Sequence, residues 1–205
     1  MKIVANNISR KFIKDWVIKN FNYTFESGKI YGITGPNGSG KSTVLQLIAG
    51  ITPSSSGTFT YFLNEKDVHL NQLYLHLGIA TPYLELIEDF TLQEQLNFHF
   101  QFKKLIHFSH LKELLAYIYL EKHAHKQIKF FSSGMKQRLK LALAIFSENQ
   151  LLLLDEPTTN LDNQGIEWYR KTILEYKGTR TLLICSNMEN EYDFADHVIN
   201  VKDFS

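Results

Sequence analysis

The sequence predicts an α/β fold with a mostly parallel β-sheet, a small antiparallel β portion near the N-terminus and an inserted helical subdomain. In the last third of the chain, short apolar runs alternate with stretches of helical periodicity, as in βαβ units. Between residues 91 and 146 the periodicity is instead mainly helical. We therefore expect one domain over residues 1–205, with its core at about 1–82 and 148–205 and the helical subdomain at about 83–147.

Strands and turns alternate in the first part of the chain. Residues 2–6 and 29–35 are β-like runs, and the second run ends in a glycine-rich loop. A helix is expected over residues 41–50, because apolar residues recur there at helical spacing and a glycine closes the stretch. Residues 21–25 and 57–62 are the runs expected to form the antiparallel portion.

The helical insertion carries one clear start signal and one conflicting signal. Thr91 and Glu94 fit a capping box at the start of a helix over residues 92–102. Within that range Phe98, Phe100 and Phe102 alternate as they would in a strand. We follow the cap and predict a helix. The elements expected in the last third are strands at 151–155, 180–186 and 198–201 and helices at 163–178 and 189–197.

Composition excludes several classes of protein. The chain is 44% hydrophobic and 21% charged, as in a folded globular domain, and its net charge of +1 gives no overall attraction to nucleic acid or anionic membranes. Cys185 is the only cysteine, so no internal disulfide is expected and a reducing compartment fits best. No signal-peptide pattern is present, and the longest aliphatic run, residues 151–154, is far too short to cross a membrane. We expect a cytoplasmic protein that reaches a membrane only through a partner.

A phosphate-binding motif occupies residues 35–43, GPNGSGKST, between an expected strand and an expected helix. Its glycines let backbone N–H groups point inward, and the following helix adds the positive end of its dipole. Lys41 is expected to reach the β- and γ-phosphates, and the Ser42 hydroxyl to coordinate Mg²⁺. The core is therefore predicted to be a P-loop NTPase core, with nucleotide contacts from Gly35, Pro36, Asn37, Gly38, Ser39, Gly40, Lys41, Ser42 and Thr43.

An acidic pair follows the four leucines of residues 151–154. Such a run indicates a strand buried on both faces, and Asp155 at its carboxyl end is suited to hold Mg²⁺ through water. Glu156 is placed to polarise a water for in-line attack on the γ-phosphate. A solvated acidic turn is the alternative for both residues, but it fits poorly beside a complete P-loop. Ser42 and Asp155 are thus the expected metal ligands, and Glu156 is the expected catalytic carboxylate.

The base of the nucleotide has a weaker signature than its phosphates. The guanine-reading pattern Asn-Lys-x-Asp has only NEKD, residues 64–67, as its nearest match, and the order there is wrong. ATP is therefore favoured, and ATP and Mg²⁺ are the expected cofactors. Phe12 lies upstream of the P-loop and can stack on adenine, although a single Phe is more often part of a core.

The order of P-loop, helical insertion, SSGMKQR, LLLLDEP and TTNLD resembles that of the ATP-binding cassette (ABC) ATPases over essentially the whole chain. In that family a Leu-Ser-Gly-Gly-Gln signature contacts the γ-phosphate of ATP on a second cassette, and two cassettes enclose two nucleotides. The resemblance implies this role for Ser132, Ser133 and Gly134, at the start of a helix whose dipole favours phosphate. It also implies that Leu161 and Asp162 form the D-loop beside the partner's site, where Asp162 can equally cap the next helix.

The chain departs from the family pattern in three regions. A family histidine that contacts the γ-phosphate is replaced by Asn187, whose amide can donate a hydrogen bond but cannot carry charge or relay a proton. A family glutamine that touches Mg²⁺ and the attacking water has no counterpart in residues 79–91, where Pro82 or Tyr83 stands nearest. Loss of a positioned donor can cost about 100-fold in rate, so slow hydrolysis by Glu156 is expected. The signature itself differs at Phe131, Ser133 and Met135.

The resemblance implies the ATPase subunit of a multi-subunit membrane transporter. Its expected partners are a second cassette, identical or different, and integral membrane permease subunits that hold it on the cytoplasmic face. A binding-only cassette that dimerises with little hydrolysis is the first alternative, motivated by Asn187 and the absent glutamine. A cassette acting on nucleic acid or ribosomes usually carries two cassettes, a coiled coil or a basic arm, and a P-loop kinase has no use for SSGMKQR. The aromatic stretch at residues 98–108 lacks a basic surplus and is expected to be subdomain core, so no nucleic acid partner is expected.

Overall fold

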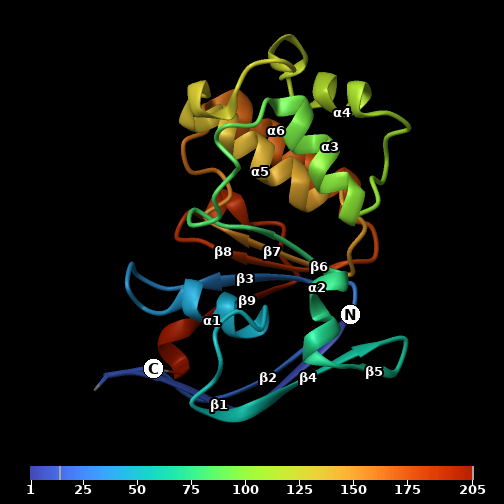
Figure 1. Cartoon of the computed structure of the whole chain (residues 1–205). Coiled ribbons are helices and arrows are strands. Elements are labelled where there is room, and N and C mark those ends of the chain that lie inside the picture. Colours follow the sequence, from blue (N-terminus) through green and yellow to red (C-terminus); the bar gives the residue numbers. More distant parts are fainter. Residues whose placement is uncertain (14, 205) are drawn as a thin grey trace. The chain divides into compact units, whose positions relative to one another are not determined.

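The computed structural model describes residues 1–13 and 15–204, which fall into two units (Figure 1). The first unit contains the phosphate-binding loop, and the second contains most of the predicted helical insertion. The first comprises Met1–Leu77, Asn149–Glu156 and the chain from Gly178 onward, and the second comprises Gly78–Glu148 and Pro157–Lys177. Within residues 1–13 and 15–204, no helix has both the length and the apolar character needed to cross a membrane.

The antiparallel portion is a four-stranded sheet in the first unit, in the order β2-β1-β4-β5. Its first two strands are longer than the predicted runs at residues 2–6 and 21–25. The polar continuation of β1 still pairs its backbone with β2 across several register shifts, while several of its side chains face solvent. The strands are β1 Lys2–Phe12, β2 Asp15–Phe25, β4 Ser56–Leu63 and β5 Lys66–Val68.

The second sheet confirms the predicted α/β class. Its order is β6-β7-β8-β3-β9, and β7, β8, β3 and β9 pair in parallel. Every residue of β7 and β8 is buried, as their near-continuous apolar sequences predict. The chain passes from the first unit to the second within β6. The strands are β3 Ile30–Thr34, β6 Leu77–Ala80, β7 Leu151–Asp155, β8 Thr181–Cys185 and β9 His197–Asn200.

The prediction of a helix at residues 189–197 is wrong. Only a 3₁₀ turn, Glu189–Glu191, forms before the chain turns into β9. The turn is held to β3: the Tyr192 ring packs so close to Gly32 that a Cβ there would lie 2.8 Å from it, and the Asp196 carboxylate accepts a hydrogen bond from the Ile30 N–H at 2.8 Å. These contacts to a neighbouring strand override the local helical signal.

The predicted helix after the P-loop is confirmed as α1, Lys41–Ile48, and Gly50 adopts a positive φ of 70° just beyond its end. The first unit also contains the short helix α2, Leu73–His76. Trp16 is 44% exposed and therefore not a core residue. Its ring lies beneath the Lys11 ammonium, 5.4 Å from the ring centroid, at the surface of the hairpin formed by β1 and β2.

The second unit contains α3 Leu92–Phe102, α4 Leu111–Tyr117, α5 Ser133–Ile145 and α6 Asn163–Tyr176. The capping box before α3 is present as predicted, and it outweighs the strand-like phenylalanine alternation. Inclusion of α6 makes this unit larger than the predicted subdomain. The reason is an aromatic core that α6 shares with α4, α5 and the loop before α4, formed by Phe108, Tyr117, Phe146, Trp168 and Tyr176. Further 3₁₀ turns lie at Leu70–Gln72, Glu121–His123, Ile128–Phe130 and Val201–Phe204.

Candidate nucleotide site

The P-loop connects the end of β3 to α1 in the first unit. Three of its glycines have positive φ angles: 144° at Gly35, 79° at Gly38 and 100° at Gly40. Gly40 is required for a second reason, because a Cβ there would lie 2.6 Å from the Val17 Cγ1 atom of β2. The loop can adopt these left-handed backbone conformations, and the close approach to β2, because these positions lack side chains.

Lys41 lies across the loop. Its ammonium donates to the Gly35 carbonyl at 2.7 Å and to the Pro36 carbonyl at 3.3 Å, and the residue is only 6% exposed. The Ser39 hydroxyl oxygen is buried without a hydrogen-bond partner. A buried ammonium group beside a glycine-rich loop at the start of a helix is an arrangement suited to bind an anion.

Asp155 ends β7 and is 2% exposed. Burial raises the pKa of its carboxyl group, and the charge of Glu156 adds to this; a hydrogen bond from Ser42 and the charge of Lys41 lower it. Its Oδ1 atom is buried without a hydrogen-bond partner. A buried, incompletely satisfied carboxylate beside a serine hydroxyl offers the oxygen ligands that Mg²⁺ prefers, so the residues fit this cofactor.

Glu156 follows in a left-handed backbone conformation, with a φ of 46°. Its N–H donates to the Cys185 carbonyl of β8 at 2.8 Å. Asn187, two residues beyond Cys185, donates from its amide to the Asn37 side-chain oxygen of the P-loop at 2.6 Å. The structure therefore brings the P-loop, the end of β7 and the loop after β8 into one site of the first unit.

Phe12 lies near the end of β1 and is 42% exposed, so it is not a core residue. The Arg10 guanidinium carbon lies 4.4 Å from the centroid of its ring. Val17 and Ile18 of the paired strand β2 are the hairpin residues nearest Gly40. The Arg10 guanidinium therefore lies over the ring, and stacking of Phe12 on a base stays a prediction.

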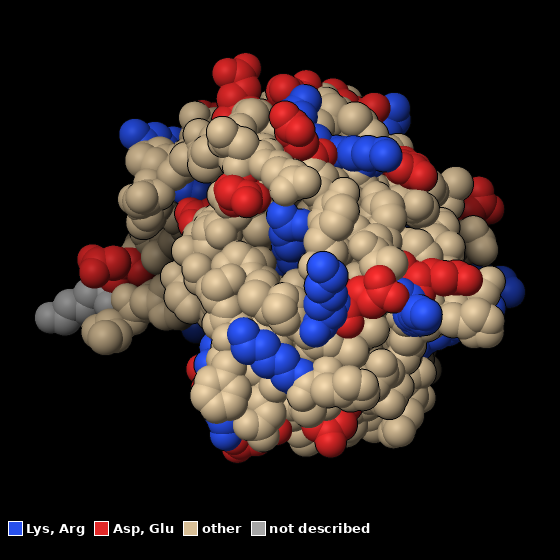
Figure 2. Space-filling model, turned by 90° about the horizontal axis from the view of Figure 1, so that it is seen from above, with Lys and Arg blue, Asp and Glu red and all other residues tan. Residues whose placement is uncertain are grey.

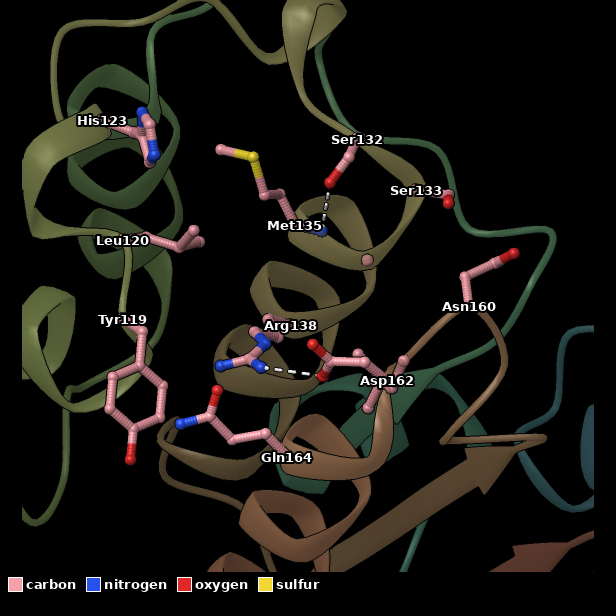
Figure 3. Close-up of a pocket in the computed structure, with 12 residues that line it drawn as sticks. Tyr119, Leu120, His123, Ser132, Ser133, Met135, Arg138, Asn160, Asp162 and Gln164 are labelled. Atoms are coloured by element: carbon pink, nitrogen blue, oxygen red, sulfur yellow. Dashed lines mark hydrogen bonds and ion pairs between the residues drawn. The ribbon is translucent and has the colours of Figure 1, made fainter.

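A separate pocket of about 530 Å³ in the second unit combines the two segments assigned to the partner's site (Figure 3). Ser132 caps α5, its hydroxyl accepting from the Met135 N–H at 3.3 Å. Ser133 and Gly134 form the first turn of α5. Asp162 caps α6, as predicted, by accepting from the Gly165 N–H at 2.8 Å.

Arg138 links the two sides of this pocket, a role that the sequence analysis did not predict. Its guanidinium lies 3.4 Å from the Asp162 carboxylate and faces the rings of Tyr119 and Trp168, at 5.2 and 5.7 Å from their centroids. Figure 3 shows Arg138 and Asp162 turned toward each other across the pocket. Gly134 lies against the loop that precedes Asp162, since a Cβ at Gly134 would lie 2.9 Å from the Asn160 carbonyl oxygen.

The segment that lacks the family glutamine is tied to α5 by a lysine. The Lys140 ammonium donates to the Thr81 carbonyl at 3.4 Å and to the Pro82 carbonyl at 3.1 Å. Tyr83 is exposed. A second residue without a predicted role, Gln137, donates from its side-chain amide to the Pro157 carbonyl at 2.8 Å. Lys140 and Gln137 both lie within three turns of Gly134 on α5. This closeness to the signature residues is the only feature of the sequence that could have indicated their roles.

Comparison with known proteins identifies the family. The family model described as "ABC transporter" matches residues 18–159. The chain is 30% identical to the linearmycin resistance ATP-binding protein LnrL of Bacillus subtilis, over 97% of this chain and 65% of LnrL, and 30% identical to the uncharacterized ABC transporter ATP-binding protein YybJ of the same organism, over 90% and 84%.

A dimeric ATP-binding cassette, solved in a post-hydrolysis state with ADP and Pi bound, has the same fold: it superposes with a TM-score of 0.82 at 21% identity, covering 97% of this chain and 93% of that one. The chain spans 65% and 66% of the lengths of the first two curated relatives. The family match and these identities agree with the site geometry. This chain belongs to the ABC transporter family, as an ATP-binding cassette of the kind found in its ATP-binding subunits.

Proposed function

We propose that this chain is the ATP-binding and ATP-hydrolysing subunit of a multi-subunit membrane transporter. In this proposal Mg-ATP drives two cassettes together, hydrolysis separates them, and permease subunits on the cytoplasmic face of a membrane use the motion for transport. The observation that carries it is the buried Asp155 carboxylate, which has one oxygen atom without a hydrogen-bond partner beside the Ser42 hydroxyl and the P-loop.

The site residues of the first unit have different roles in the proposed reaction. Lys41 exchanges its hydrogen bonds to the P-loop carbonyls for the β- and γ-phosphate oxygens. Ser42 and Asp155 would hold Mg²⁺, which would supply positive charge beside those oxygens. Glu156 orients the attacking water and accepts its proton. Asn187 exchanges its bond to Asn37 for the γ-phosphate, to which it can donate but not transfer a proton.

The second cassette contributes through the pocket of its second unit. Ser132, Ser133 and Gly134 supply a hydroxyl, small side chains and N–H groups at the start of a 13-residue helix, where a phosphate is favoured. Asp162 and its loop lie on the same pocket and would meet the partner copy beside this phosphate. In this proposal, the second unit of each chain therefore contacts the nucleotide that is bound to the other chain, and not the nucleotide of its own first unit.

The runner-up is a cassette that binds ATP and dimerises but scarcely hydrolyses it. The specific observation in its favour is Asn187, which occupies the position of the family histidine and is hydrogen-bonded to the P-loop. A role on nucleic acid has less support, since acidic side chains lie among the basic ones on the face shown in Figure 2 and the net charge is only +1.

Steady-state Mg-ATP turnover and equilibrium ATP binding test the proposal in wild type, Glu156→Gln and Asn187→His. We expect wild-type turnover, a loss of about 100-fold or more in Glu156→Gln with ATP binding retained, and a gain in Asn187→His. Glu167→Gln, on the exposed face of α6, is the matched control and should match wild type. ATP binding without turnover in any variant would favour the binding-only cassette, and an absence of ATP binding would overturn both.

A further inference from the structure

Glu156 lies between two hydrogen-bond anchors that belong to different units. It is the last residue of its segment in the first unit, and Pro157 begins the next segment in the second unit. On one side the Glu156 N–H donates to the Cys185 carbonyl at 2.8 Å, within the first unit. On the other side the Pro157 carbonyl accepts from the Gln137 side-chain amide at 2.8 Å, within the second unit.

The backbone of Glu156 needs such anchors. A φ of 46° is a left-handed conformation that costs a non-glycine residue about 1–2 kcal/mol. Pro157 restricts the backbone further, because a proline disfavours the α-helical region of φ and ψ at the residue before it and its ring fixes its own φ. A strained conformation of this kind persists only where its surroundings determine it. Cys185 and Gln137 provide that determination from the two sides.

Gln137 is well placed for this task. It is 6% exposed and lies on α5, one turn beyond Gly134 at the start of the same helix. Pro157 is itself buried, so its carbonyl would lose its side-chain donor if Gln137 were replaced by an apolar residue. A rigid helix therefore joins the segment expected to meet the partner's phosphate to the peptide group directly after the expected catalytic carboxylate.

We propose that Gln137 is a positioning residue for hydrolysis, which sets the backbone of Glu156 through Pro157. The inference rests on the proposed ATPase function. Gln137 touches neither nucleotide nor water in this proposal. It makes the orientation of the Glu156 carboxylate depend on the placement of α5, and so on whether the signature residues have met a phosphate.

The test replaces Gln137 with Met, which conserves length and approximate volume but cannot donate a hydrogen bond. Gln137→Asn, which keeps an amide that cannot reach, serves if Gln137→Met does not fold. Gln93→Leu is the control, because the Gln93 side-chain amide donates to Asn97 of the same helix, α3. We would measure kcat, KM, binding of a fluorescent ATP analogue, and amide hydrogen exchange of residues 156–160.

We expect kcat to fall by about 10-fold to 100-fold in Gln137→Met, with KM and ATP binding within twofold of wild type, because misplacement of a catalytic group by about 1 Å can cost 100-fold. Adding Gln137→Met to Glu156→Gln should cause no further loss, since the first change acts through the second residue. A merely structural role would instead lower stability and affinity together and leave kcat near wild type.

The outcomes separate this inference from the function on which it rests. Wild-type kcat in a folded Gln137→Met, or a full additional loss in the Glu156→Gln background, would overturn it. If the wild type binds ATP without turnover, or does not bind it, the proposed function fails and hydrogen exchange decides the inference. Faster exchange at residues 158–160 in Gln137→Met, but not in Gln93→Leu, would then support positioning, and unchanged exchange would overturn it.

Discussion

Gly40→Ala should destabilise the first unit through one identifiable contact. The new Cβ would lie 2.6 Å from Val17 Cγ1, a separation at which one of the two must move. Overpacking of this kind costs about 1–3 kcal/mol. The φ of 100° adds about 1–2 kcal/mol, of which the stiffer unfolded chain returns about 0.4–1 kcal/mol. The expected total is a loss of about 3 kcal/mol in the free energy of unfolding.

Two further variants isolate the contact from the backbone strain. Gly38 has a similar positive φ of 79°, but a Cβ there would have no heavy atom within 4 Å. Gly38→Ala should therefore cost about 1 kcal/mol or less. Val17→Ala removes the atom in conflict, and the double variant with Gly40→Ala should recover about 1–2 kcal/mol relative to the sum of the single changes.

Urea unfolding followed by circular dichroism measures these free energies, and ATP binding reports the consequence for the P-loop. Gly40→Ala should bind ATP more weakly than Gly38→Ala, and Val17→Ala should restore part of that loss. Equal costs for the two glycine variants, or additivity of Gly40→Ala and Val17→Ala within about 0.5 kcal/mol, would refute the reasoning. The close approach of β2 to the P-loop would then not constrain this glycine.

Two other predictions concern the second unit. Thr91→Ala should lower the free energy of unfolding by about 1 kcal/mol, because the cap to the Glu94 N–H is lost. Thr91→Ser keeps a capping hydroxyl and should stay within about 0.5 kcal/mol of wild type; equal losses for the two variants in urea titrations would argue against the cap. Burial and the charge of Lys103 lower the pKa of His99, whose ring contacts Ser147 at 2.7 Å. Because the pKa of His99 is lower in the folded than in the unfolded state, folding favours the neutral ring. The contribution of neutral His99 to the free energy of unfolding is present above about pH 6.5 and is lost as pH falls through the folded-state pKa. His99→Gln should therefore flatten the decline in urea midpoint between pH 7.5 and 5, and an unchanged decline would contradict the assignment.

The local features of this protein were predictable because consecutive residues specify them. The P-loop pattern, the strand that ends at Asp155 and the capping box at Thr91 each depend on residues within a few positions of one another. Asp162 was likewise identifiable as a helix cap from the residues that follow it. Residues 189–197 were mispredicted because contacts from β3, far away in sequence, outweigh their local preference.

The contacts that assemble the site join residues distant in sequence, and only the tertiary structure decided them. Asn187 meets Asn37 across 150 positions, and nothing in either segment indicates the other. Gln137 reaches the Pro157 carbonyl because α5 packs against the loop after β7. A sequence motif predicts the chemistry of its own residues, but it does not predict which distant residues contact them. Which backbone carbonyl a distant side chain holds depends on how helices pack, because packing follows from the shapes of many side chains at once.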